Sequence, residues 1–130
     1  MIAIAVTQLE YDKAEETFRT AEGVQCIPVS SEENALAAAI RKHGARYVIV
    51  GVDRYVGPLY AALPRGGVIA RFGVGCDGID PAQAAKHGVL CCNTPGVLDQ
   101  SVAECAIALM FDAARHIARG NCELRSGTWK

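Results

Sequence analysis

The sequence lacks the charge clusters and long apolar runs that mark several large classes of protein. Its 13 basic and 14 acidic residues give a formal net charge of −1 and form neither a basic stripe nor an acidic tail. This balance argues against a nucleic-acid or charged-membrane surface as the partner. No apolar run reaches the ~18 residues that a membrane-spanning helix needs. The hydrophobic content of 51% is that of an ordinary soluble globular domain.

The sequence also lacks paired metal-ligand motifs. The cysteines show no CxxC spacing, and the three histidines (His43, His87 and His116) lie far apart. A structural zinc site needs such paired ligands, so we expect no metal. We expect free and mostly buried thiols in the reducing environment of the cytoplasm. The cysteines are Cys26, Cys76, Cys91, Cys92, Cys105 and Cys122.

Apolar strand-like runs alternate with helix-like segments along most of the chain. Near-continuous runs of Val, Ile and Ala, each followed by a helix, indicate a parallel sheet that is covered on both faces. Five such units predict an α/β, doubly wound, flavodoxin-like domain. The predicted strands are Ile2–Val6, Val24–Val29, Tyr47–Val52, Gly67–Phe72 and Val89–Asn93. The predicted helices are Tyr11–Ala21, Glu32–His43, Gly57–Leu63 and Pro81–His87, with Ser30 or Ser31 capping the second and Asp80 the fourth.

The last predicted helix differs from the others. Ser101 and Glu104 have the spacing of a capping box, which predicts a helix over Val102–Arg119 that ends at Gly120. Its first three turns are apolar on nearly every side. A helix of this kind needs cover on every side, which indicates contact with a second domain or a second subunit.

Gly73, Gly75 and Gly78 form a GxGxxG motif after the fourth predicted strand. Taken alone, the motif suggests a loop that binds a dinucleotide pyrophosphate. Against this, the start of the next helix at Pro81 lies after the third glycine, and that helix is short for a βαβ crossover. Asn93 also stands where such a fold would place an acid. A simple turn, with glycines that permit positive φ, is the alternative.

A larger pattern surrounds these glycines. The run Gly73-Val-Gly-Cys-Asp-Gly-Ile-Asp80 is followed by Asn93-Thr-Pro-Gly96, by Ser101-Val-Ala-Glu104 and by Arg125-x-Gly-x-Trp129. Together these motifs resemble the D-isomer-specific 2-hydroxyacid dehydrogenases, NAD-dependent oxidoreductases that are built from two α/β domains. Gly78 stands where Asn is commoner in the family. We expect this difference to cost little, because both residues tolerate a left-handed backbone.

The resemblance implies a third role for the glycine loop, which is to bind substrate. The backbone amides of Val74 and Gly75, with Cys76 following, would face the carboxylate of a small 2-hydroxy or 2-oxo acid. Free amides at the carboxyl end of a parallel strand suit an anion because they donate hydrogen bonds without carrying a mobile charge. Val52 and Asp53 would border the same substrate.

The resemblance also implies a cofactor, a partner copy and a division of the chain. Residues 1–100 would form the substrate-binding domain, and residues 101–130 an interdomain and dimerisation helix with the start of a nucleotide-binding domain. Val102 would touch the nicotinamide ring of NAD, and Val102–Arg119 would pair with a second copy in a homodimer. The turn Asn93–Gly96 would close the substrate site.

The chemistry of the family needs an Arg clamp, a His acid–base, an acidic partner for that His and a pyrophosphate loop. In the family these elements follow the segment that is matched here, so we assign no catalytic residue to this chain. We expect the chain alone to bind NAD weakly and to be inactive.

Two other functions compete with this interpretation. One is a non-enzymatic flavodoxin-like module that binds a small acid or dimerises. The other is a phosphoryl-accepting receiver domain, with Asp53 as the acceptor. A receiver needs an acidic pair after its first strand and a lysine after its fifth, whereas Thr7-Gln8 and Thr94-Pro95 occupy those places here. Likeness of fold alone assigns no function.

Overall fold

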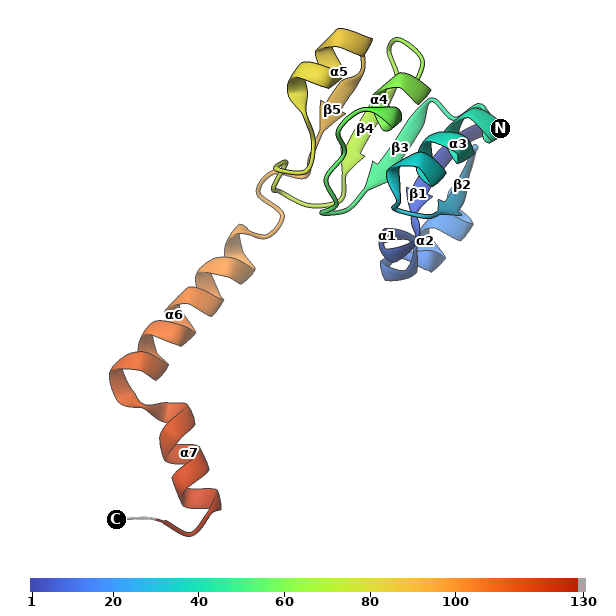
Figure 1. Cartoon of the computed structure of the whole chain (residues 1–130). Coiled ribbons are helices and arrows are strands. Elements are labelled where there is room, and N and C mark those ends of the chain that lie inside the picture. The colour runs from blue at the N-terminus through green and yellow to red at the C-terminus, as the bar shows by residue number, and fades with distance from the viewer. Residues whose placement is uncertain (129–130) are drawn as a thin grey trace. The chain divides into compact units, whose positions relative to one another are not determined.

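The structure, a computed structural model, describes residues 1–128 and contains two compact units, one up to Pro95 and one from Gly96 onward. The first unit has one sheet of five parallel strands in the order β2-β1-β3-β4-β5 (Figure 1). The strands are β1 (Ile2–Thr7), β2 (Val24–Val29), β3 (Tyr47–Val50), β4 (Val68–Arg71) and β5 (Leu90–Cys92). This order, with helices in the connections, confirms the predicted doubly wound, flavodoxin-like α/β fold.

The helices of the first unit fall in the connections between these strands. The first predicted helix is in fact two short ones that are separated at Ala14, whose amide turns back to the carbonyl of Tyr11 at 3.1 Å. The rings of Tyr11 and Phe18 stack across the break, with centroids 5.6 Å apart. The helices are α1 (Gln8–Lys13), α2 (Glu15–Thr20), α3 (Glu33–His43), α4 (Pro58–Ala62) and α5 (Pro81–His87).

The N-terminal cap of α3 was predicted wrongly. Glu32 caps the helix, and its carboxylate accepts hydrogen bonds from the amides of Asn34 and Ala35 at 2.9 and 2.8 Å. Ser30 instead accepts the amide of Glu32 itself, at 3.2 Å. A carboxylate takes two amides at once and also suits the positive end of the helix dipole. The same backbone hydrogen bonds lower the pKa of Glu32.

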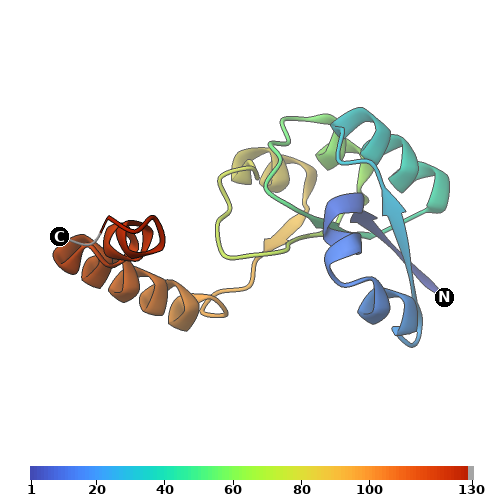
Figure 2. The ribbon, with the colours of Figure 1, turned by 90° about the horizontal axis from the view of Figure 1, so that it is seen from below.

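The core of the first unit lies where α3 and α4 meet the central strands. Its buried side chains come from strands β1, β3 and β4 and from the apolar faces of these two helices. They include Ala5, Val48, Val50, Ile69, Leu36, Leu59 and Tyr60. Strand β5 closes one edge of the sheet (Figure 2), and all three of its residues are exposed.

The second unit consists of two helices, α6 (Asp99–Arg115) and α7 (Ile117–Arg125). The prediction of one helix that ends at Gly120 is wrong, because the break falls at His116, which has a left-handed φ of 55°. Asp112 explains the break. Its carbonyl accepts the amide of His116 at 2.7 Å, and its carboxylate accepts the amide of Ala118 at 2.6 Å. A side chain that satisfies a free amide can begin a new helix.

The predicted capping box at the start of this unit is also wrong. Helix α6 begins at Asp99, so Ser101 lies inside the helix and Leu98 takes the capping position without a side-chain hydrogen bond. The carboxylate of Glu104 accepts from Gln100 at 2.8 Å instead of reaching back to the cap. An acidic residue in the first turn, here Asp99, favours the earlier start.

Helix α6 contains no buried residue. Its apolar side chains are exposed, and Met110, at 70%, is the most exposed of them. This agrees with a helix that needs cover from another surface. None of the helices in residues 1–128 has the length and apolar character that crossing a bilayer requires. The exposed apolar residues of α6 are Val102, Ile107, Leu109, Met110 and Phe111.

Candidate functional site

Two loops at the carboxyl ends of neighbouring strands form the candidate site. Residues 51–57 follow β3 and residues 72–80 follow β4, and the two strands are paired in the sheet. The amide of Tyr55 donates to the carbonyl of Gly78 at 2.9 Å and joins the loops. Ligands of doubly wound domains bind at this edge of the sheet.

The 72–80 loop presents a row of backbone donors. At its start, the amide of Gly73 bonds to the carbonyl of Arg71 at 2.9 Å. The five amides that follow have no acceptor among residues 1–128, and successive unpaired amides of this kind are suited to holding an anion. They belong to Val74, Gly75, Cys76, Asp77 and Gly78.

The segment after β5 holds this loop in place. The side-chain amide of Asn93 donates to the carbonyl of Val74 at 2.7 Å, and the backbone amide of Thr94 donates to the carbonyl of Gly73 at 3.1 Å. These two bonds fix the first half of the loop against β5. They give Asn93 a positioning role that its place in the sequence motif did not reveal.

The 72–80 loop does not have the geometry of a loop that binds a dinucleotide pyrophosphate. Helix α5 begins at Pro81, and Asp80 caps it by accepting from the amides of Ala82 and Gln83 at 2.9 and 3.2 Å. Gly78 therefore lies before the cap and not in the first helical turn, where a dinucleotide loop places its third glycine.

Gly78 is required because the 51–57 loop packs closely against it. The expectation of a left-handed backbone at this position is wrong, because Gly78 does not have a positive φ. A Cβ at this position would collide with the carbonyl oxygen of Asp53, and it would lie 3.1 Å from that of Val52. Only glycine allows the two loops to approach so closely.

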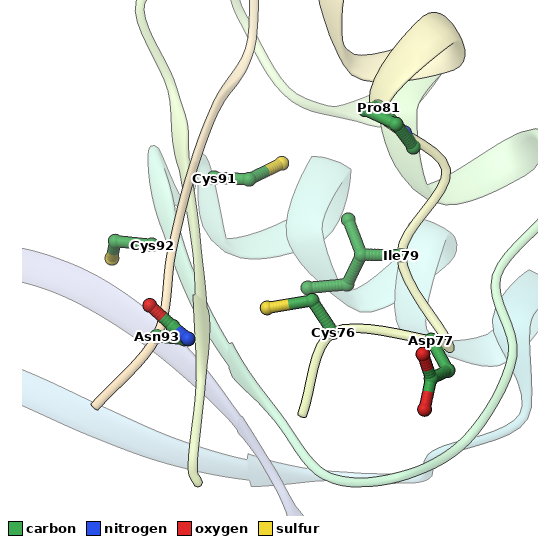
Figure 3. A pocket seen from close by; sticks show the side chains of 7 residues that line it. All are labelled: Cys76, Asp77, Ile79, Pro81, Cys91, Cys92 and Asn93. Atoms are coloured by element: carbon green, nitrogen blue, oxygen red, sulfur yellow. The ribbon is translucent and has the colours of Figure 1, made fainter. Parts of the chain in front are cut away.

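The predicted substrate residues line two hollows of the first unit. Val52 and Gly75 border a hollow of about 90 Å³, together with Arg71. Cys76 borders a larger hollow of about 390 Å³, which β5 bounds on the other side (Figure 3). The remaining two predicted residues are placed by their backbones: the carbonyl of Asp53 packs on Gly78, and that of Val74 accepts from Asn93.

Three charged residues at this edge, Arg54, Arg71 and Asp77, were not among the predicted site residues. Arg71 is the last residue of β4, and its guanidinium donates to the carbonyl of Phe72. Arg54 borders a third hollow, of about 180 Å³, and Asp77 borders all three. The position of Arg71 at the carboxyl end of a central strand was the signal that could have identified it.

Hydrogen bonds to Glu33, at the start of α3, hold the 51–57 loop in position. The Glu33 carboxylate accepts from the amides of Val56, Gly57 and Leu59 at 3.0, 2.9 and 3.1 Å. These amides include the free donors at the start of α4, so one side chain both caps that helix and positions the loop. Glu33 lies more than twenty residues earlier in the chain, and no local motif identifies this contact.

Two buried ionisable groups lie close to the same loops. Burial raises the pKa of Glu10, but hydrogen bonds from Thr7 and Lys13 outweigh this effect, and the net pKa lies below its ordinary value. A Cβ at Gly51 would collide with the Glu10 carboxylate. Burial, followed by the charge of Asp53, raises the pKa of Tyr55 well above its ordinary value.

The cysteines and histidines partly depart from expectation. All six thiols are free, as expected, but Cys26 is half-buried and the other five are exposed, so the expectation of mostly buried thiols is wrong. His43 and His87 lie in the last turns of α3 and α5, and His116 lies at the break before α7.

Residues 1–128 contain no cluster that could hold a metal ion. Val102 lies on α6 and is exposed.

The doubly wound parallel sheet places the unpaired amides beyond β4 at the carboxyl edge of the strands, where α/β domains of this class hold their ligands. Residues 4–124 match the model of the D-isomer specific 2-hydroxyacid dehydrogenase catalytic domain, and the chain belongs to this family. This membership leaves no support for the receiver-domain alternative.

Several known proteins are similar to the chain. A glyoxylate reductase of Thermococcus litoralis is 35% identical over 103 residues, which are 79% of this chain and 31% of that protein. A hydroxypyruvate reductase of Thermotoga maritima is 48% identical over 63 residues, which are 48% of this chain and 21% of that protein. The chain thus spans about a third or less of the length of these relatives.

A solved structure extends the likeness to the whole fold. The NADPH-dependent glyoxylate/hydroxypyruvate reductase from Sinorhizobium meliloti, in complex with NADP and malonate, is 30% identical with a TM-score of 0.78. The match covers 98% of this chain and 39% of that one.

Proposed function

We propose that this chain supplies the substrate-binding part of an oxidoreductase that transfers a hydride between NAD(H) and a small 2-hydroxy or 2-oxo acid. The row of unpaired amides beyond β4 carries the proposal. The substrate carboxylate accepts hydrogen bonds from the amides of Val74 and Gly75. Val52 borders the substrate, and Arg71 adds a positive charge to the same hollow.

The chain's residues bind and orient the acid but do not carry out the proton transfer. The cofactor supplies the hydride when it is bound, and Val102 contacts its nicotinamide ring. Residues 1–100 act as the substrate domain and residues 101–130 as the interdomain helix. Since none of residues 1–128 is placed as a general base, we expect the chain alone to be inactive. We also expect it to bind NAD weakly and to act in the cytoplasm.

The amide site makes a prediction for NMR spectroscopy. Adding glyoxylate to the isotopically labelled protein should shift the backbone amide signals of residues 74–78, with saturation at millimolar concentrations. A Kd of ~1 mM corresponds to only about 4 kcal/mol, which suits a small anion held by a few hydrogen bonds. Glycolaldehyde, which has no carboxylate, should leave these signals unchanged.

Two variants at one position test the hydrogen-bond donors themselves. Gly75→Pro removes an amide donor and should weaken glyoxylate binding about tenfold, a loss of ~1.4 kcal/mol. Gly75→Ala keeps the donor, and a Cβ there has open space, with Asp77 the nearest contact at 4.0 Å. Equal binding by both variants, or shifts confined to other loops, would remove the proposal's support.

The exposed apolar residues of α6 favour a homodimer in which Val102–Arg119 faces a partner copy. Light scattering at micromolar concentration should therefore show a dimer or a larger species. Leu109→Glu and Met110→Glu should each shift this species toward the monomer, whereas the matched change Lys42→Glu on α3 should not. A monomeric wild-type chain would contradict the prediction.

The same exposed helix supports a second candidate function, in which the chain is a non-enzymatic dimerisation module. Association without any response of residues 74–78 to glyoxylate would favour this candidate over the dehydrogenase half.

A further inference from the structure

Two thiols face each other across the hollow that lies beside the amide row. Cys76 comes from the 72–80 loop and Cys91 from β5, and both line the hollow of about 390 Å³. In Figure 3 the side chains of Cys76 and Cys91 point into this space near Ile79, whereas that of Cys92, which also borders the hollow, points to the other side of the strand.

The strand register explains why Cys91 and not Cys92 faces the loop. Cys91 pairs with Ile69 of β4, which is fully buried, and Cys92 pairs with Ala70. Paired residues of a parallel sheet point to the same face, and successive residues point to opposite faces. Cys91 therefore lies on the face of Ile69, and the sequence alone does not distinguish it from its neighbour.

The loop is already tied to this strand at a point close to both thiols. Asn93, two residues after Cys91, donates to the carbonyl of Val74, two residues before Cys76, at 2.7 Å. The thiols therefore flank an existing contact between the same two segments.

We propose that Cys76 and Cys91 form a reversible modification site, in which a hydroperoxide oxidises the two thiols to a disulfide that locks the 72–80 loop onto β5. Its regulatory consequence rests on the proposed function, because the locked loop carries the amides that would hold the substrate acid. The disulfide itself rests only on the positions of the two thiols.

The two thiols have different roles in the oxidation. The thiolate of Cys76, on the exposed loop, attacks the peroxide oxygen. The O–O bond breaks, and the leaving oxygen takes a proton and departs as water or an alcohol. Cys91, on the other side of the hollow, carries out the second step. Its sulfur attacks the Cys76 sulfenic acid, the S–S bond forms and water leaves. The peroxide gains the two electrons that the thiols lose.

Mass spectrometry of the full chain tests the site. After hydrogen peroxide treatment and alkylation without reductant, trypsin should release peptide 72–86 joined to peptide 87–115. The second peptide contains Cys91, Cys92 and Cys105, and a Cys105→Ser background leaves only the two cysteines of β5. In this background, Cys92→Ser should keep the linkage and Cys91→Ser should abolish it. A link through Cys92, or links only between separate molecules, would overturn the proposal.

Ligand binding then separates the disulfide from its consequence. The reduced protein should show the glyoxylate shifts of residues 74–78, and the oxidised protein should bind about tenfold more weakly, with recovery after dithiothreitol. Unchanged affinity after oxidation would overturn the regulatory role. A disulfide in a protein that never binds glyoxylate would leave the modification site intact and reject the proposed function.

Discussion

Replacing Glu33 with Ala should lower the free energy of unfolding by about 2 kcal/mol, because hydrogen bonds to a charged group are worth roughly 1.5–3 kcal/mol. The carboxylate accepts from the amides of Val56, Gly57 and Leu59, and it is the one side chain among residues 1–128 that binds all three. For a unit of about this size the midpoint of thermal unfolding should fall by roughly 10 °C. Circular dichroism during heating measures the change.

Two matched variants show whether the effect comes from these hydrogen bonds. Glu33→Gln keeps an acceptor oxygen and should lose only part of the stability. Glu22→Ala removes an exposed glutamate of the same charge at the turn before β2 and should change the midpoint little. If all three variants unfold together, the contacts at the start of α4 do not stabilise the fold. The NMR signals of residues 52–57 should also broaden in Glu33→Ala, because the loop loses its anchor.

The sheet could be predicted from the sequence because its signals are local. Each strand is a short, mostly apolar run with a glycine, proline or charged residue nearby, and all five strands were found with end errors of at most two residues. Helix α5 was predicted with the bounds that it has, since Asp80, Pro81 and Gly88 each act within one turn. Such signals depend on neighbouring residues alone.

The helices of the second unit were predicted less well, because competing local signals are close in energy. Gly120 is a plausible terminator, but the carboxylate of Asp112 captures the amide of Ala118 and ends α6 earlier. A glycine inside α7 costs only about 1 kcal/mol relative to Ala. Which hydrogen bond prevails cannot be read from spacing.

The candidate site shows the same limit. The motif identified the 72–80 loop, but the partners that shape it come from distant segments. Asn93 holds the loop and the carbonyl of Asp53 packs on Gly78. Glu33 fixes the neighbouring loop through more than twenty intervening residues. These contacts depend on how parallel strands bring their carboxyl ends together, and single-residue patterns do not encode them.

Gly78→Asn should destabilise the protein by roughly 3 kcal/mol, the upper part of the range for overpacked sites. A Cβ at this position would lie 3.0 Å from the carbonyl carbon of Asp53 and closer still to its oxygen. Both obstacles are backbone atoms, so no side-chain rotation relieves the collision. The loops would have to separate, and the hydrogen bond from Tyr55 to the carbonyl of Gly78 would be lost.

Chemical denaturation of three variants tests this account. Gly78→Ala adds only the Cβ and should cost most of the same free energy, because the collision is with that atom. Gly75→Ala, in the same loop, places its Cβ in open space and should be nearly neutral. If Gly78→Asn were as stable as the wild type, the two loops would not approach as closely as the structure describes. The Asp53 carbonyl would then not be what requires glycine at position 78, and the geometry of the amide row would need revision.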